Sequence, residues 1–133
     1  MSNDEPVVEY EPVTRLGAAY AKVLFDIWNK IGRPTDITTT SGLKMLDETI
    51  RVWEKAFPHE VIDWMHDMSI DREAERTIQQ HIKGGGYNPV SYPPTLFHLI
   101  KIMLPELKLG DKRVHHTICQ RHPNLFKTTN YAV

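Results

Sequence analysis

The sequence predicts an all-α fold, a compact bundle of five or six helices with a flexible acidic N-terminal leader. Three observations support this prediction. Apolar residues recur at spacings of three and four along most of the chain, which is the period of an amphipathic helix. No segment alternates apolar and polar residues over five positions between turn signals, so strand signals are absent. With 133 residues, 41% of them hydrophobic and 25% charged, the chain has the composition of one globular domain with its own core.

Residues 1–13 are expected to form the leader, because two prolines oppose regular structure there. From Thr14 the pattern becomes helical, and several apolar residues share one face of the helix. These residues are Leu16, Tyr20, Val23, Leu24, Ile27 and Ile31. The Gly-Arg-Pro run at 32–34 should end this first helix, since glycine and then proline commonly follow a helix C-terminus. Residues 14–133 are expected to form a single helical domain.

A linker over residues 35–42 precedes the second predicted helix, for which Thr40 or Ser41 supplies an N-cap oxygen. The apolar positions of this helix alternate at spacings of three and four, which is typical of a seam that packs against another helix. They are Leu43, Leu46, Ile50, Trp53 and Phe57. Pro58 should break or kink the chain after them.

Two further helices are expected before the proline-rich loop. One runs from His59 to Met68 and the other starts near Ser69. The first carries five apolar residues: Val61, Ile62, Trp64, Met65 and Met68. The second is largely polar with a narrow apolar stripe: Ile70, Ala74, Ile78 and Ile82. Three glycines end it, and the prolines that follow predict an extended loop over residues 84–94.

The last two predicted helices are short. Pro94 suits the first turn of the fifth, whose residues 95–104 are apolar almost all round and therefore expected at the centre of the bundle. Asp111 is expected to cap the sixth, over residues 111–122, and Pro123 should end it.

Charge is distributed unevenly along the chain. Residues 1–13 hold four acids and no base, residues 14–100 hold ten bases and eleven acids, and residues 101–133 hold six bases and two acids. Five bases of this last segment are candidate contacts to the phosphates of single-stranded DNA: Lys108, Lys112, Arg113, Arg121 and Lys127. Thr117 and Gln120 add hydrogen-bonding groups beside them. The alternative is a solvated surface whose charges happen to segregate, and a pI near 6.6 is low for a dedicated nucleic-acid domain.

A histidine-rich stripe is a candidate metal site. His115, Cys119 and His122 fall at i, i+4 and i+7, so their side chains project from one face of a helix and could supply three ligands to zinc. The fourth ligand would have to come from elsewhere, for example from His98 or His81. The alternative is that Cys119 packs as a small hydrophobic residue while the histidines are solvated.

Aromatic residues divide into two groups. Trp28, Trp53 and Trp64 fall on apolar helix faces and are expected in the core. Tyr87 and Tyr92 lie in the proline-rich loop, where they are candidate partner-binding residues. The alternative for these tyrosines is that they attach the loop to the core.

No residues have the spacing of a catalytic site, so the chain is not expected to be an enzyme. The glycines at 84–86 lack the following lysine and hydroxyl residue of a phosphate-binding loop. Glu60, Asp63 and Asp67 have the helical spacing of a divalent-cation site, but an exposed acidic stripe explains them better.

The sequence predicts a cytoplasmic protein that does not enter a membrane. A single cysteine excludes an internal disulfide bond. The N-terminus is acidic where a secretory signal would be basic and then apolar. The longest apolar run is also well short of the roughly 20 residues that a membrane helix needs.

A helix bearing Trp53, the polar stretch after it and the Tyr-Pro-Pro-Thr-Leu run at 92–96 form a recognisable pattern. Over residues 43–104 it resembles the middle of the lambda-P-type phage replication proteins, which load the host's replicative helicase onto DNA. That family continues with proline, an acid and phenylalanine, where this chain has Phe-His-Leu at 97–99. The resemblance implies a small phage or plasmid accessory protein that binds a helicase and single-stranded DNA in the bacterial cytoplasm.

Three functions are compatible with these observations. The first is a small non-enzymatic adaptor that binds a protein partner, such as a replicative helicase, and contacts single-stranded DNA through its basic C-terminal helix. The second is a purely protein-binding inhibitor or regulator of a host or defence enzyme, without DNA contact. The third is a regulator stabilised by zinc at the histidine-rich stripe.

Overall fold

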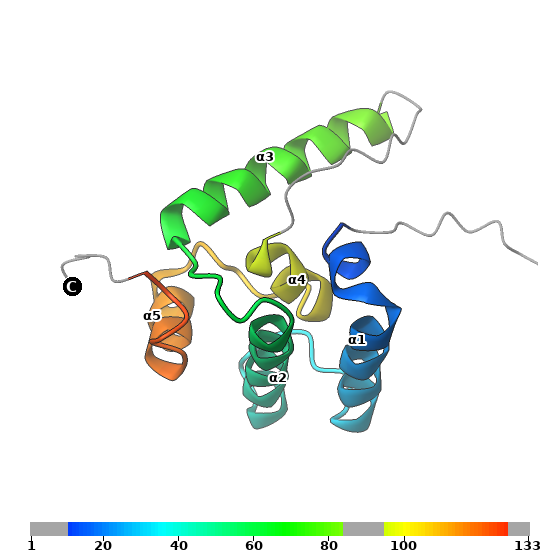
Figure 1. Cartoon of the computed structure of the whole chain (residues 1–133), viewed down its shortest axis with the longest axis vertical. Coiled ribbons are helices and arrows are strands. Elements are labelled where there is room, and N and C mark those ends of the chain that lie inside the picture. Colours follow the sequence, from blue (N-terminus) through cyan, green and yellow to red (C-terminus); the bar gives the residue numbers. More distant parts are fainter. Residues whose placement is uncertain (1–10, 84–94, 128–133) are drawn as a thin grey trace, which may run out of the picture.

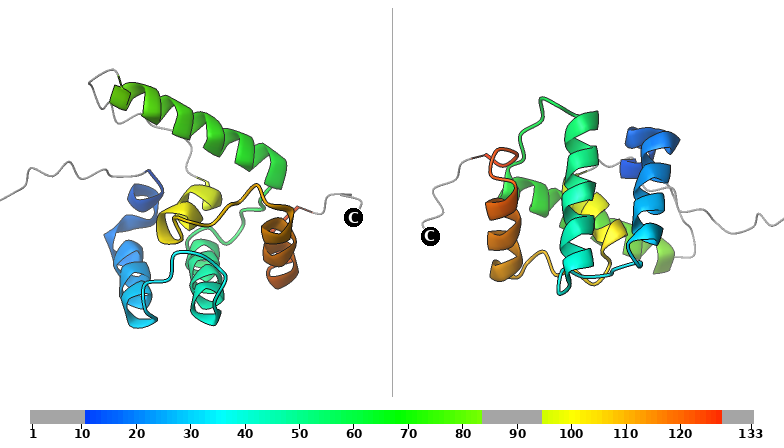
Figure 2. Two further views of the ribbon diagram at one scale, coloured as in Figure 1. Left: turned by 180° about the vertical axis from the view of Figure 1, so that it is seen from behind. Right: turned by 90° about the horizontal axis from the view of Figure 1, so that it is seen from below.

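The computed structural model describes residues 11–83 and 95–127, and these residues form five α-helices and no strand. The all-α prediction is therefore confirmed. The helices are α1 (Glu11–Lys30), α2 (Thr40–Ala56), α3 (Trp64–Lys83), α4 (Leu96–Met103) and α5 (Lys112–Arg121). In Figure 1 and in the view from below in Figure 2, α2 lies between α1 and α5, and in Figure 1 α3 crosses above these three helices. None of the described helices combines the length and apolar character needed to cross a membrane.

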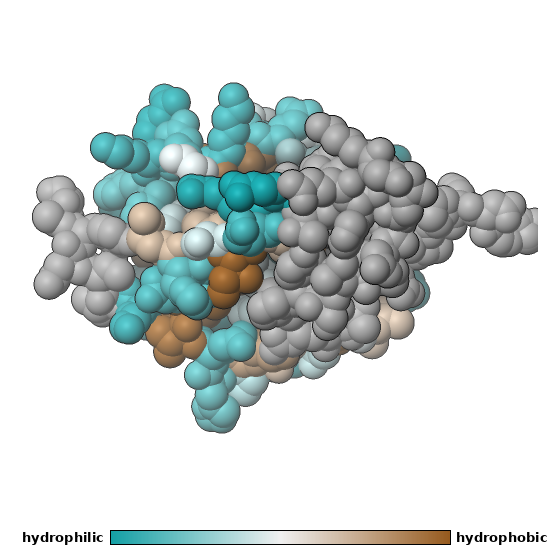
Figure 3. Space-filling view, turned by 90° about the horizontal axis from the view of Figure 1, so that it is seen from above, coloured by the Kyte–Doolittle hydropathy of each residue, from teal (hydrophilic) through white to brown (hydrophobic). Residues whose placement is uncertain are grey.

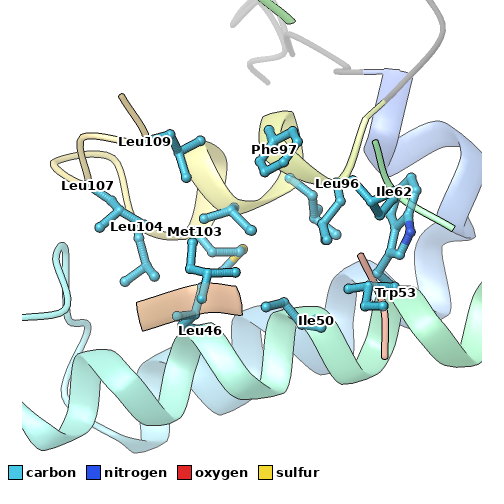
Figure 4. Close-up of a cluster of buried hydrophobic side chains, with 14 of the residues drawn as sticks. Leu46, Ile50, Trp53, Ile62, Leu96, Phe97, Met103, Leu104, Leu107 and Leu109 are labelled. Atoms are coloured by element: carbon cyan, nitrogen blue, oxygen red, sulfur yellow. The ribbon is translucent and has the colours of Figure 1, made fainter. Parts of the chain in front are cut away.

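Helix α4 is the centre of the fold, as its apolar composition predicts. It contacts α1, α2 and α3, and its apolar residues are buried except for Ile102, which is half-buried. Figure 4 shows this core with side chains of α2, of α4 and of the segments next to them: Leu46, Ile50, Trp53, Ile62, Leu96, Phe97, Met103, Leu104, Leu107 and Leu109. The helix begins one residue after Thr95, whose hydroxyl oxygen accepts a hydrogen bond from the backbone N–H of His98 at 3.1 Å. Thr95 is thus the N-cap, and Pro94 lies outside the described residues.

Helix α2 buries a wider face than its predicted seam. Three predicted core residues are fully buried, Leu46, Ile50 and Trp53. Leu43 and Phe57 are only half-buried. Three residues beside the seam are buried instead: Met45, Thr49 and Val52. The face is broad because α2 packs against both α1 and α4. The helix also starts one residue early, because Thr39 and not Thr40 or Ser41 caps it, with Oγ1 3.0 Å from the N–H of Gly42.

Helix α1 starts inside the predicted leader. Pro12 lies in its first turn, where the missing N–H of proline has no intrahelical partner to lose. Gly17 kinks the helix with φ 85° and ψ 158°, a conformation that residues with a Cβ rarely adopt. Leu16 and Leu24 enter the core, whereas Val23, predicted on the buried face, is exposed.

The prediction of two helices between residues 59 and 83 was wrong. Residues 59–63 are not helical, and one continuous helix, α3, follows them. The backbone of Ile62 instead pairs with a distant segment: its N–H donates to Leu125 at 2.9 Å, and its carbonyl accepts from Lys127 at 2.8 Å. The carboxylate of Asp63 then accepts from the N–H of His66 at 3.2 Å and caps the start of α3.

Helix α5 matches its prediction closely. Asp111 caps it through a hydrogen bond of 2.8 Å from the backbone N–H of Arg113. The segment before α5 is tied to the rest of the fold by the N–H of Glu106, which donates to the carbonyl of Thr35 at 2.9 Å. Ile118 is the fully buried residue of the helix.

Candidate nucleic-acid interface

An ion-pair cluster fixes the C-terminal end of α5 to α2. Asp47 accepts from Arg121 Nε at 2.9 Å and from Arg121 Nη2 at 2.5 Å, and His122 Nε2 lies 2.8 Å from its Oδ1. Two parallel contacts of this kind between guanidinium and carboxylate are strong and geometrically specific. Burial alone would raise the pKa of Asp47, but the hydrogen bonds from Arg121 and His122 outweigh it and hold the pKa below its ordinary value. The cluster therefore sets how α5 sits on the bundle.

The inner face of α5 packs on the core. Val114 and Cys119 are half-buried beside Ile118. His115 lies with its ring centroid 4.1 Å from the ring of Trp64. Burial, and then the nearby His116, lower the pKa of His115, so its imidazole favours the neutral form against this aromatic ring.

The outer face of α5 carries cations and no acid. Lys112, His116 and Gln120 are exposed at i, i+4 and i+8, and they form a stripe about 12 Å long at the helical rise. Arg113 beside them is almost fully exposed, with one nitrogen 3.3 Å from the capping carboxylate of Asp111. A helix surface of this kind can make several contacts to an anionic chain.

Two exposed lysines flank this stripe. Lys108 is held next to the start of α5 because its carbonyl accepts the N–H of Asp111 at 3.0 Å. Lys127 lies beyond the other end of the helix, where its backbone pairs with Ile62. We call Lys108, Lys112, Arg113 and Lys127 the basic face.

Arg121 differs from the other four predicted phosphate contacts. Its guanidinium makes two hydrogen bonds to Asp47 of α2, which gives it a structural role in holding α5, whereas Arg113 makes one contact of 3.3 Å to the N-cap Asp111 of its own helix. Thr117 is also engaged within the helix, since its hydroxyl donates to the carbonyl of Arg113 at 2.8 Å. Asp47 was not singled out by the sequence analysis, because 74 residues separate it from Arg121.

The described residues do not assemble the candidate zinc site. Within residues 11–83 and 95–127, no group of three His, Cys, Asp or Glu side chains is placed to hold a metal ion. The three residues on the stripe are engaged separately: the ring of His115 contacts the ring of Trp64 at a tilted angle, His122 binds Asp47, and Cys119 packs against the core, where burial raises the pKa of its thiol.

A second ion-pair cluster, which the sequence analysis missed, joins α3 to α4. Asp71 is only 3% exposed, with His98 Nδ1 3.0 Å from its Oδ1 and Lys101 Nζ 2.8 Å from its Oδ2. Burial would raise the pKa of Asp71, but the hydrogen bonds from His98 and Lys101 outweigh it and lower the pKa below its ordinary value. Two basic residues at i and i+3 in an otherwise apolar helix were the available signal, because a basic side chain on a helix that is largely buried needs an acidic partner.

Two other groups of predicted residues remain. Tyr87 and Tyr92 lie outside the described residues, so their role in partner binding stays a prediction. The three acidic residues Glu60, Asp63 and Asp67 do not share one helix face as predicted, because Glu60 and Asp63 precede α3. Its carboxylates are still close enough for electrostatic coupling: burial raises the pKa of Asp67, and the charges of Asp63 and Glu60 raise it further against the opposing effect of His66.

Comparison with protein-family models, with curated proteins and with solved structures finds no match to this chain. The resemblance to lambda-P-type replication proteins over residues 43–104 therefore stays a prediction.

Proposed function

We propose that this protein is a small non-enzymatic adaptor that binds the phosphate backbone of single-stranded DNA with its basic face and a protein partner with a separate surface. The observation that supports it is the exposure of four cations on and beside α5, a helix that itself carries no acid. One of the four, Arg113, contacts the capping carboxylate of Asp111 at 3.3 Å, which offsets part of the charge. Four cations against this carboxylate leave an excess of positive charge for an anion that approaches.

The partner is proposed from the resemblance over residues 43–104, which points to a replicative helicase. An adaptor of this kind would bring the helicase and a DNA strand together without chemistry of its own. The alternative remains a protein-binding regulator that does not touch DNA.

Salt dependence separates these two functions. Binding of labelled oligothymidine to the full chain is measured by fluorescence anisotropy over a series of salt concentrations. Four phosphate contacts to a single strand predict a slope of log affinity against log salt of about −3. A flat response would remove the DNA role and leave the regulator.

The variant with Lys112→Ala and Arg113→Ala tests the assigned surface. It should reduce the slope by roughly half while the melting temperature stays unchanged, because alanine keeps the backbone N–H that Asp111 caps. A matched control removes two exposed cations elsewhere, with Lys30→Ala on α1 and Arg72→Ala on α3. An equal loss in the control would show that net charge, and not the basic face, binds the DNA.

A further inference from the structure

Two large apolar side chains stand exposed where the chain enters α3. Val61 is 61% and Met65 is 62% exposed, more than any other large hydrophobic residue that the structure describes. Figure 3 shows the face that α3 crosses, on which hydrophobic patches interrupt a largely hydrophilic surface. Exposed apolar groups that lie close together on a domain commonly mark a protein interaction site.

The backbone holds these side chains outside the core. Ile62, which follows Val61, is buried, and its backbone pairing with the 125–127 segment fixes which side of the chain faces the core. Because successive side chains of an extended segment point to opposite sides, burying Val61 would expose Ile62. Met65 lies in the first turn of α3, next to the buried Trp64.

Three carboxylates lie within two residues of Val61 or Met65 in the chain. Glu60 and Asp63 adjoin Val61 and Ile62 in the chain, and Asp67 follows one turn into α3. Their mutual repulsion contributes to the raised pKa of Asp67, with His66 as the opposing charge on the same helix. Lys127 belongs to the basic face and borders this region, because its backbone N–H donates to the carbonyl of Ile62.

We infer that Glu60, Val61, Asp63, Met65 and Asp67 form an acidic–apolar surface that binds a segment of the partner protein in which lysine or arginine flanks an apolar side chain. Such a segment would cover Val61 and Met65 and bring positive charge to three carboxylates that repel one another. The surface repels phosphate, so it complements the basic face and keeps protein and DNA apart on the adaptor. This inference rests on the proposed adaptor function and names the surface that the partner would use.

The test uses the full chain and a synthetic peptide of leucine and lysine at helical spacing, labelled with fluorescein. Binding is measured by anisotropy. The variant with Val61→Ser and Met65→Ser should weaken binding by about tenfold or more, and so should the variant with Glu60→Gln and Asp67→Asn. Asp63 is left unchanged because its carboxylate caps α3.

The matched control is Val23→Ser with Phe25→Ser, which removes two exposed apolar residues of α1 and should change the affinity less than about twofold. A second peptide with glutamate in place of lysine should not bind. The inference is overturned if the lysine peptide fails to bind, or if it binds the control and surface variants equally. It is also overturned if sedimentation shows that the wild type self-associates and that the Val61 and Met65 variant does not, because the occupant would then be a second copy.

Oligothymidine binding distinguishes this result from a failure of the adaptor proposal. The acidic–apolar variants should keep the wild-type salt slope, whereas the Lys112 and Arg113 variant should keep the wild-type peptide affinity. If the acidic–apolar variants lose peptide binding but keep the salt slope, the partner surface is located. If the wild type has a flat salt slope but binds the peptide, only the DNA role is removed. Competition between peptide and oligothymidine for the wild type would contradict two separate surfaces.

Discussion

Replacing Asp71 with asparagine should destabilise the fold by removing the charge that joins α3 to α4. The carboxylate is 3% exposed and receives hydrogen bonds from His98 at 3.0 Å and Lys101 at 2.8 Å. Asparagine keeps the shape of aspartate, but its amide nitrogen is a donor and would face one of these two donors. The change therefore leaves the half-buried ammonium of Lys101 with a weakened partner.

The magnitude follows from the burial of the three groups. Removing one member of a fully buried ion pair costs about 3–5 kcal/mol. His98 is 15% and Lys101 29% exposed, so the lysine can recover part of its hydration by turning outward. We therefore expect a loss of about 2–3 kcal/mol, or a fall in melting temperature on the order of 10 °C.

Urea denaturation followed by circular dichroism measures this loss, which should appear as a lower midpoint with an unchanged slope. The folded pKa of Asp71 is lowered, so its contribution is present above the ordinary value of 3.8 and is lost as the pH falls through the folded pKa. The difference between wild type and variant should therefore shrink in acid. Asp26→Asn, in an exposed pair with Lys22, is the control and should change stability by less than about 0.5 kcal/mol. An equally small effect of Asp71→Asn would refute the reasoning.

Three further predictions concern stability. Trp53→Ala should cost about 3–5 kcal/mol in urea denaturation because the side chain is fully buried in the α2 seam, and a loss below about 1 kcal/mol would contradict that packing. Gly42→Ala should lower the free energy of unfolding by about 2–4 kcal/mol, because a Cβ there would lie 1.8 Å from the backbone oxygen of Asp36 in the preceding loop. The control is Gly110→Ala, whose Cβ would meet nothing within 4 Å and which should leave the melting temperature nearly unchanged. Asp67→Asn should raise the melting temperature at neutral pH. The pKa of Asp67 is raised in the folded protein, so the stability that the protonated carboxyl contributes is lost as the pH rises through that pKa. An unchanged or lower melting temperature would show that this carboxylate has a stabilising partner.

Helix type and helix ends could be predicted where the determining chemistry is local. The N-cap at Asp111 depends only on a carboxylate that accepts a hydrogen bond from the backbone N–H two residues later, and it was predicted correctly. The central position of α4 followed from its composition, because a helix that is apolar on all sides must be covered on all sides. Of the five bases predicted to contact DNA, Lys112 and Arg113 are exposed on α5 and Lys108 and Lys127 are exposed outside it, and their contact with DNA stays a prediction.

Tertiary structure decided the features that depend on residues far apart in the chain. The role of Arg121 could not be assigned without Asp47, and the buried charge of Asp71 needed its partners on α4. Sequence alone therefore determined the helical class and the central helix, because spacing and capping act within one or two turns. Only the folded chain decided that Ile62 pairs with the 125–127 segment while Val61 and Met65 stay exposed. The physical reason is that an apolar run shows that burial is favoured but not which of its side chains the rest of the molecule has room to cover.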